Sequence, residues 1–110
     1  MCRALVVLCV ATDEAALAAL KAASVSADWE LAPGATDVRS VLDQIDSERP
    51  HVLVIFGEHE ELITIVRARS PSIRIVSDRD APGATVVATS LDEVRGLVLG
   101  LPRPGGPVGA

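Results

Sequence analysis

A cysteine and a histidine are the residues of this sequence best suited to nucleophilic catalysis. Cys9 lies near the end of the apolar run 4–10, and His59 comes shortly after the apolar run 51–56. A thiolate activated by a neighbouring imidazole can form covalent intermediates. A cysteine within an all-apolar strand is more commonly an inert core residue, and we favour that interpretation. We therefore do not predict an enzyme.

Carboxylates offer a second kind of chemistry. Four side chains could supply oxygen and nitrogen ligands to a divalent metal: Asp13, Glu58, His59 and Asp78. The run GEHEE at 57–61 is also an acidic helix start, where the helix dipole stabilises carboxylates, and we favour this interpretation. The segment CVATDEA at 9–15 contains no glycine, which excludes a phosphate-binding loop of the dinucleotide type. We predict neither a metal nor another cofactor.

These side chains must be positioned by strands that alternate with helices. Apolar or β-rich runs predict five strands, over 4–10, 28–32, 51–56, 73–76 and 84–89. Apolar residues at helical spacing predict four helices. The first is capped at Thr12 and Asp13, the second at Thr36 and the last at Ser90, and the third covers 60–69. Ser90 and Glu93 have the spacing of a capping box. His51 begins the third strand at the far edge and has no evident partner.

This alternation predicts an α/β fold, a three-layer, doubly wound, mainly parallel sheet of five strands in the order 2-1-3-4-5. The first and last helices should share one face, and the second and third helices the other. Only eight residues, 77–84, lie between Val76 and Thr85, so we expect a loop in place of the fourth helix. An antiparallel fifth strand is the alternative. We predict one domain over 1–101 and a Pro/Gly-rich tail or linker over 102–110.

Composition limits the partners. The 110 residues carry a net charge of -5 and only 2% of them are aromatic, which argues against binding of nucleic acid or of an anionic membrane. No apolar run is long enough to span a bilayer. Cys2 and Cys9 are too few for a disulfide framework, and we interpret them as reduced thiols of a cytoplasmic protein. Arg3 followed by an apolar run outlines a short signal peptide, which is the less favoured alternative.

The element order and the run RPHVLVIF at 49–56 resemble a response-regulator receiver domain of the flavodoxin-like class. Receivers commonly have Arg or Lys, then Pro and Asp, ahead of a strand that ends in the phospho-accepting Asp. In this sequence His51 stands where the first Asp is common, and Phe56 stands at the acceptor position. The family's acidic, magnesium-binding pair corresponds to Cys9 and Val10.

Other positions of the family pattern are also changed. Ser77 matches the Ser or Thr that ends the family's fourth strand, whereas Val87 and Ala88 replace the Lys-Pro pair that ends the fifth. Phosphoryl transfer to a carboxylate needs that carboxylate, a divalent cation and a nearby cationic side chain. The resemblance therefore implies a pseudo-receiver, a protein-interaction or regulatory module that is not phosphorylated. The alternative is a small-molecule sensor that binds a neutral ligand at the carboxyl edge of the sheet.

Three regions contain the candidates for ligand binding or interaction. The crevice at the carboxyl edge contains Thr12, Asp13, Phe56, Gly57 and Ser77. The shortened link between the last two strands should uncover an apolar face with Ile75 and Val87, and the last helix carries Leu97 and Leu99 beyond its inward residues. We expect one of these apolar surfaces to bind a protein partner or a second copy of the chain, as a dimer.

Overall fold

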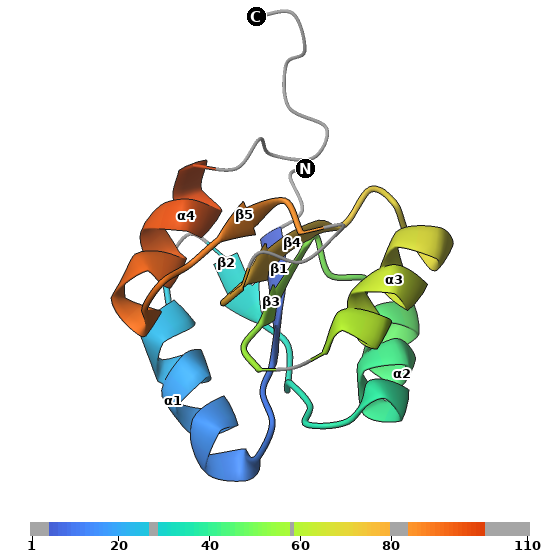
Figure 1. Cartoon of the computed structure of the whole chain (residues 1–110), viewed down its shortest axis with the longest axis horizontal. Coiled ribbons are helices and arrows are strands. Elements are labelled where there is room, and N and C mark those ends of the chain that lie inside the picture. Colours follow the sequence, from blue (N-terminus) through green and yellow to red (C-terminus); the bar gives the residue numbers. More distant parts are fainter. Residues whose placement is uncertain (1–4, 27–28, 58, 80–83, 101–110) are drawn as a thin grey trace, which may run out of the picture.

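Strands and helices alternate in the computed structural model, which describes residues 5–26, 29–57, 59–79 and 84–100 (Figure 1). The strands are β1 (Leu5–Val10), β2 (Trp29–Leu31), β3 (Val52–Ile55), β4 (Arg74–Ser77) and β5 (Val86–Val87). The helices are α1 (Glu14–Ser24), α2 (Val38–Glu48), α3 (Glu60–Arg69) and α4 (Val94–Gly100), with a 3-10 turn, η1 (Leu91–Glu93), ahead of α4. The described residues do not include Cys2, the first residues of the segment that outlines a signal peptide, or the predicted tail over 102–110.

The strands form one parallel sheet in the order β2-β1-β3-β4-β5, which confirms the predicted fold. β5 runs parallel to β4, with Val76 opposite Val86, so the antiparallel alternative is wrong. β3 is buried at all of its positions and β1 at all but Val6. Strands that are covered on both faces read as continuous apolar runs, which is the pattern that the sequence shows.

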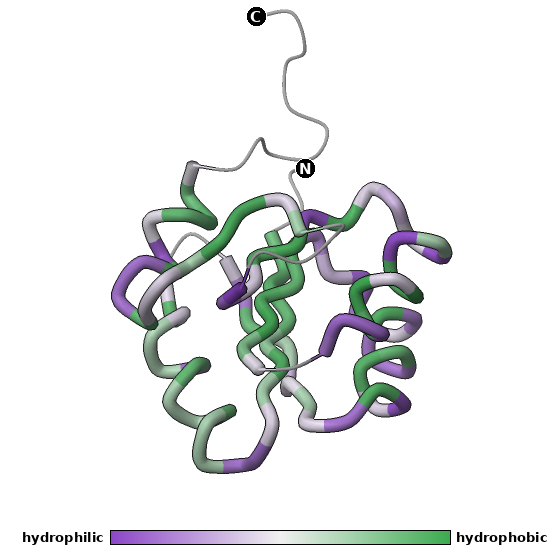
Figure 2. The backbone as a smooth tube through the Cα atoms, in the orientation of Figure 1, coloured by the Kyte–Doolittle hydropathy of each residue, from purple (hydrophilic) through white to green (hydrophobic). Residues whose placement is uncertain are grey.

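Helices cover both faces of the sheet. α1 and α4 lie on one face, and α2 and α3 lie on the other, as predicted (Figure 1). Successive β1 side chains enter the two resulting cores: Cys9 packs in the core under α1 and α4, and Leu8 in the core under α2 and α3. Figure 2 shows the strands as a continuous hydrophobic centre. In the described part of the chain, no helix combines the length and the apolar character needed to cross a bilayer.

Carboxylates cap the first two helices. Asp13 accepts the backbone N–H of Ala16 at 2.7 Å. The second helix is capped by Asp37 and not by Thr36, which the sequence had suggested, and Asp37 accepts the backbone N–H of Ser40 at 3.0 Å. The Ser40 hydroxyl also donates to Asp37. The hydrogen bond from the Ser40 backbone, and next the one from its hydroxyl, lower the pKa of the Asp37 carboxyl. A charged acceptor forms the stronger cap, which explains why the aspartate is used.

The predicted capping box before the last helix does not form. The Ser90 side chain makes no cap hydrogen bond. Glu93 instead accepts the hydroxyl of Thr89 at 2.8 Å and also the Thr89 backbone N–H. The partner of Glu93 is therefore Thr89, one residue before the predicted Ser90. These bonds, first from the Thr89 backbone and then from its hydroxyl, lower the pKa of the Glu93 carboxyl.

The connection between β4 and β5 has no helix among its described residues 78, 79, 84 and 85. Thr85 organises its end: the backbone N–H of Thr85 donates to the Ile75 carbonyl at 2.8 Å, and the Thr85 hydroxyl accepts the Ile75 N–H at 3.1 Å. Arg67 of α3 also donates to that hydroxyl, at 2.9 Å. Ile75 is fully buried, so the prediction that the short link uncovers it is wrong: it lies in the core under α2 and α3, against which Ala84 also packs.

Candidate functional site

The loops after β1, β3 and β4 meet at the carboxyl edge of the sheet, where ligands bind in open α/β folds. Phe56 and Asp78 extend the ladders there, with backbone N–H groups that donate to Val10 and Ile55 at 2.9 and 3.1 Å. The chain after β1 comes very close to the chain after β3.

Gly57 and Thr12 make that close approach. A Cβ atom built on Gly57 would lie 2.4 Å from the Thr12 methyl carbon Cγ2, and Gly57 has φ +113°, a conformation that other residues rarely adopt. Glycine is therefore required here both by space and by backbone conformation. The Thr12 methyl group lies against Gly57, which leaves less room for a ligand between these two loops.

Asp78 is fully engaged at the same edge. Its carboxylate accepts the Gly57 backbone N–H at 3.1 Å and the Arg79 Nε–H at 3.2 Å. Ser77 is 1% exposed, and its hydroxyl oxygen accepts the Arg79 backbone N–H at 3.2 Å. The sequence suggested Asp78 only as a metal ligand and did not suggest this tie between loops. Its position directly after a buried strand was the available signal.

The other two predicted crevice residues serve the scaffold. Asp13 is exposed, and one of its carboxylate oxygens is used as the cap of α1. Phe56 is half-buried and packs against the core under α1 and α4. The structure thus brings Thr12 and Gly57 together, with Asp78 and Ser77 beside them, whereas Asp13 begins a helix and the Phe56 ring joins the core.

Cys9 is not placed for nucleophilic chemistry. It is 1% exposed, and burial raises the pKa of its thiol to about 11, which outweighs the lowering by a hydrogen bond with Ser24 and by the charge of Lys21. A thiol with this pKa is almost entirely protonated at neutral pH. Within the described residues the structure has no hydrogen bond between Cys9 and His59. His59 directly precedes α3, and its Nε2 atom is buried without a hydrogen-bond partner.

Metal ligands do not gather in the part of the chain that the structure describes. No group of three or more His, Cys, Asp and Glu side chains there is arranged to hold an ion. Glu58, one of the four residues considered from the sequence, lies outside the described residues. Asp13 and Asp78 are each engaged in the hydrogen bonds given above.

Two of the predicted surface residues are large, apolar and exposed. Val87 of β5 is 37% exposed and Leu99 of α4 is 49% exposed. Leu97 instead lies half-buried against the core under α1 and α4. Val25, after α1, is also exposed, at 55%, and had not been singled out in the sequence. These three are the large apolar side chains that are exposed among the described residues, and contact sites are marked where such side chains form a contiguous surface.

His51, at the opposite edge of the sheet, has a structural partner that the sequence did not reveal. The Nδ1 atom of His51 accepts the backbone N–H of Val6 at 3.0 Å, and the backbone N–H of His51 donates to the Val6 carbonyl at 2.8 Å. The imidazole therefore replaces a backbone acceptor at the start of the β1–β3 ladder. The signal in the sequence was its place between Pro50 and a buried strand.

Comparison with known proteins identifies the fold alone. No protein-family model matches the sequence, and no curated protein matches it. A cobalamin-binding protein from Desulfitobacterium hafniense is similar in structure, with a TM-score of 0.67 and 13% identity over 88% of this chain and 58% of that one. The receiver domain of RcsB from Salmonella enterica serovar Typhimurium, solved with the phosphomimetic BeF3⁻, has a TM-score of 0.58 and 16% identity over 73% of this chain and 66% of that one. This chain thus covers less than two thirds of either neighbour, and the flavodoxin-like arrangement predicted from the sequence is confirmed.

Proposed function

We propose that this domain is a non-catalytic pseudo-receiver, a regulatory module that acts through protein contacts and is not switched by phosphorylation. The observation that carries the proposal is Phe56, which replaces the acceptor Asp in the sequence resemblance and whose half-buried ring packs against the core under α1 and α4. The nearby carboxylates of Asp13 and Asp78 are engaged in a helix cap and in an ion pair with Arg79. Structural similarity to a response-regulator receiver supports a regulatory role.

Incubation with acetyl phosphate tests the chemical half of this proposal. With Mg²⁺ present, the intact mass should not change, and beryllofluoride should leave the NMR spectrum of the carboxyl edge unchanged, because the acceptor carboxylate is missing. The receiver domain of RcsB, treated in parallel, is the positive control. A mass increase of one phosphoryl group that disappears when Mg²⁺ is removed would show that the domain is phosphorylated after all.

The interaction half of the proposal rests on the exposed apolar residues of β5 and α4. A domain without a phosphorylation trigger presents the same surface at all times, so binding through Val87 or Leu99 is expected to be constitutive. Burying such side chains stabilises a complex by about 25 cal/mol per Å² of apolar area removed from water. We propose the α4 side, around Leu99, as the contact surface because Leu99 is the more exposed of the two.

Leu99→Asp tests that surface, with Ser47→Asp as the matched control. Both residues are exposed and next to last in their helices, so each substitution adds the same charge at a helix C-terminus, but α2 lies on the opposite face of the sheet. Light scattering over a concentration series should give a larger mass for the parent and for Ser47→Asp than for Leu99→Asp. Equal masses for all three proteins, together with equal recovery of partners in a pull-down, would refute the α4 contact.

A second candidate function is the binding of a small molecule at the carboxyl edge. Two observations favour it: one structural neighbour is a cobalamin-binding protein, and the buried Nε2 atom of His59 has no partner. Cobalamin itself is the probe, and its absorbance spectrum reports a change in axial ligand. A spectral change with the parent that is lost in His59→Ala would favour this function over the pseudo-receiver, and an unchanged spectrum would exclude ligation of cobalamin by His59.

A further inference from the structure

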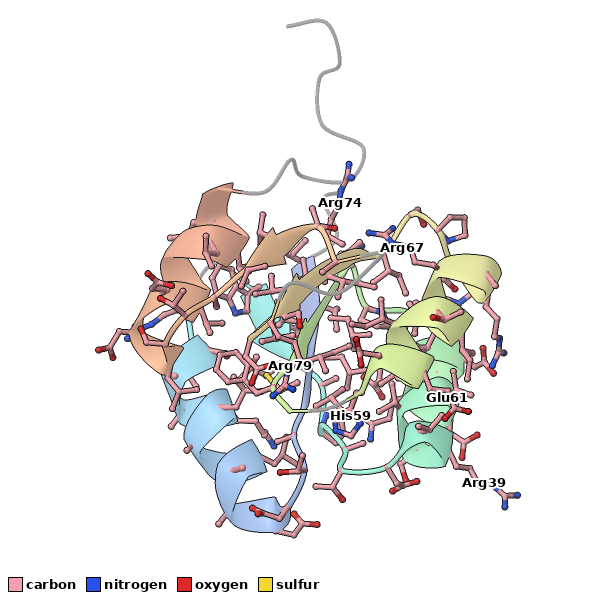
Figure 3. The ribbon with its side chains drawn as sticks, in the orientation of Figure 1. Arg39, His59, Glu61, Arg67, Arg74 and Arg79 are labelled. Carbon is pink, nitrogen blue, oxygen red and sulfur yellow. The ribbon has the colours of Figure 1, made fainter. Side chains whose placement is uncertain are left out.

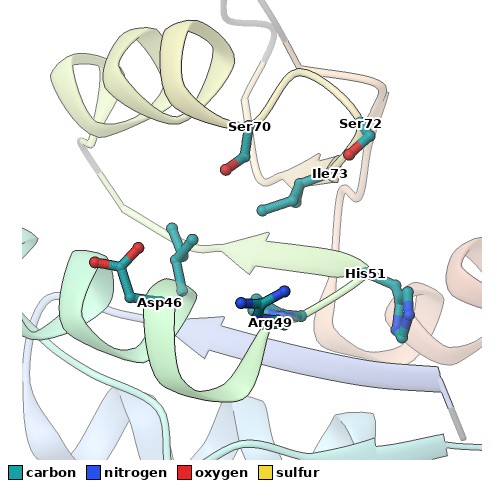
Figure 4. A pocket seen from close by; sticks show the side chains of 8 residues that line it. Asp46, Arg49, His51, Ser70, Ser72 and Ile73 are labelled. Atoms are coloured by element: carbon teal, nitrogen blue, oxygen red, sulfur yellow. The ribbon is translucent and has the colours of Figure 1, made fainter. Parts of the chain in front are cut away.

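A cavity of about 400 Å³ lies at the amino edge of the sheet, on the side away from the predicted crevice. It is bounded by the C-terminal ends of α2 and α3 and by the starts of β3 and β4, and Figure 4 shows Ser70, Ser72 and Ile73 facing Asp46 and Arg49 across it. Its volume falls in the range of small-molecule sites. No pattern in the sequence indicated this cavity, because its walls come from segments about 20 residues apart.

The cavity has an apolar floor and a polar rim. The buried residues Ile45, Pro50 and Ile73 line it, and the hydroxyl groups of Ser70 and Ser72 stand at its upper side in Figure 4. An apolar surface with a few polar groups around it is the common composition of a ligand site.

The walls of the cavity are held by hydrogen bonds. Arg67 donates to the carbonyl groups of Pro71 and Ile73, at 2.9 and 3.3 Å, and so fixes the turn that carries the two serines. The Ile73 N–H donates to the Ser70 carbonyl at 3.1 Å. A site that is formed before the ligand arrives loses less conformational entropy on binding.

The charges around the cavity leave one cation unbalanced. Asp46 is paired with Arg69, whose guanidinium lies 3.2 Å from a carboxylate oxygen, so these two charges offset each other. The Arg49 guanidinium lines the cavity, and no acidic side chain is paired with it among the described residues. His51 uses its Nδ1 atom to accept the Val6 backbone N–H at 3.0 Å. The cavity is therefore complementary to a single negative charge.

Arg49 also adopts an unfavourable backbone conformation. It has φ +50° and ψ +60° at the end of α2, and among the described residues it is the only non-glycine residue with positive φ. Glycine is the usual residue at such a helix end, and a residue before proline normally favours an extended conformation. A strained residue of this kind is a reason to look for a function of its side chain.

We propose that this cavity binds a small organic carboxylate, with the carboxylate group on Arg49, hydrogen bonds from Ser70 and Ser72, and the apolar body over Ile45 and Ile73. A guanidinium binds a carboxylate through two parallel N–H donors, and hydroxyl groups supply further donors. The proposal is independent of the proposed function, since it uses the opposite edge of the sheet and neither of the exposed residues of β5 and α4.

Three probes of the same size distinguish the charge that the cavity accepts. Benzoate, benzamide and benzylamine share a ring and differ in carrying a negative, no or a positive charge. Titration into the ¹⁵N-labelled protein should move the amide signals of Arg49, Ser70, Ser72 and Ile73 with benzoate, and much less with the other two. Benzylamine could be favoured instead by the carbonyl groups at the two helix ends. Stronger binding of benzylamine, or shifts spread over the whole protein, would overturn the proposal.

Three arginine variants test the role of the guanidinium. Arg49→Met should weaken benzoate binding about tenfold, because one charge-assisted contact is lost. Arg39→Met, on the same helix with its side chain directed into solvent in Figure 3, should leave it unchanged. Arg49→Gly removes the same guanidinium and should weaken binding at least as much, while the melting temperature rises by about 5 °C because glycine accepts positive φ. Benzoate binding that survives in both Arg49 variants would show that the cavity does not recognise the carboxylate through Arg49.

Discussion

The contact between Gly57 and Thr12 makes a quantitative prediction about the carboxyl edge. In Gly57→Ala the new methyl group would lie 2.4 Å from Thr12 Cγ2, which is closer than two carbon atoms can approach. Thr12 is β-branched and has few alternative rotamers, so moving its methyl group costs about 0.5–1.5 kcal/mol. Alanine at φ +113° adds roughly 1–3 kcal/mol of backbone strain. We therefore expect Gly57→Ala to lower the free energy of unfolding by about 3 kcal/mol.

Thr12→Ser separates the two contributions. Serine keeps the hydroxyl group and lacks Cγ2, so the steric contribution disappears while the backbone strain at position 57 stays. In the Thr12→Ser background, Gly57→Ala should thus cost about 2 kcal/mol. The difference, a coupling energy of about 1 kcal/mol, exceeds the roughly 0.3–0.5 kcal/mol by which independent sites depart from additivity.

Urea denaturation of the four proteins, followed by far-ultraviolet circular dichroism, measures this coupling. Equal m-values across the four proteins would show that the unfolding transition itself is unchanged. A coupling energy of zero would mean that the two loops are further apart than the structure places them, and that the crevice between them is open. In that case the Thr12 methyl group does not restrict the space between the two loops.

Three further predictions concern single interactions. Because burial raises the pKa of the Cys9 thiol from 9.0 to about 11, its contribution to stability is fully present below pH 9 and is lost as the pH rises through 11. The loss is about 2–3 kcal/mol, and alkaline urea denaturation of Cys9→Ala should lack it; the same pH profile for both proteins would disprove the shift. His51→Leu should cost about 1–3 kcal/mol because the Val6 N–H loses its acceptor, whereas His51→Asp should restore an acceptor and most of the stability; equal losses in thermal melts would argue against this bond. Thr85→Val should accelerate hydrogen exchange of the Ile75 amide, since the hydroxyl that accepts it is removed, and unchanged exchange would count against this role of Thr85.

The sequence by itself determined the layers and the order of the sheet. Continuous apolar runs such as 51–56 require strands covered on both faces, and strands covered on both faces require helices between them. The helical spacing of Val41 and Ile45 also identified the buried face of α2 correctly. These are local patterns, and they could be predicted because the burial of apolar side chains is nearly independent of which neighbour covers them.

The tertiary structure alone decided which polar groups meet. The tie from Asp78 to Gly57 joins residues 21 positions apart, the bond from Val6 to His51 joins residues 45 positions apart, and neither has a local pattern. The burial of Ile75 depended in the same way on Ala84 and on the core under α2 and α3. Hydrogen bonds are short-ranged and directional, so their partners are set by backbone positions that only the assembled sheet fixes. For the same reason, spacing along the chain predicted β3 and β4, but it could not predict that their starts would border the cavity at the amino edge of the sheet.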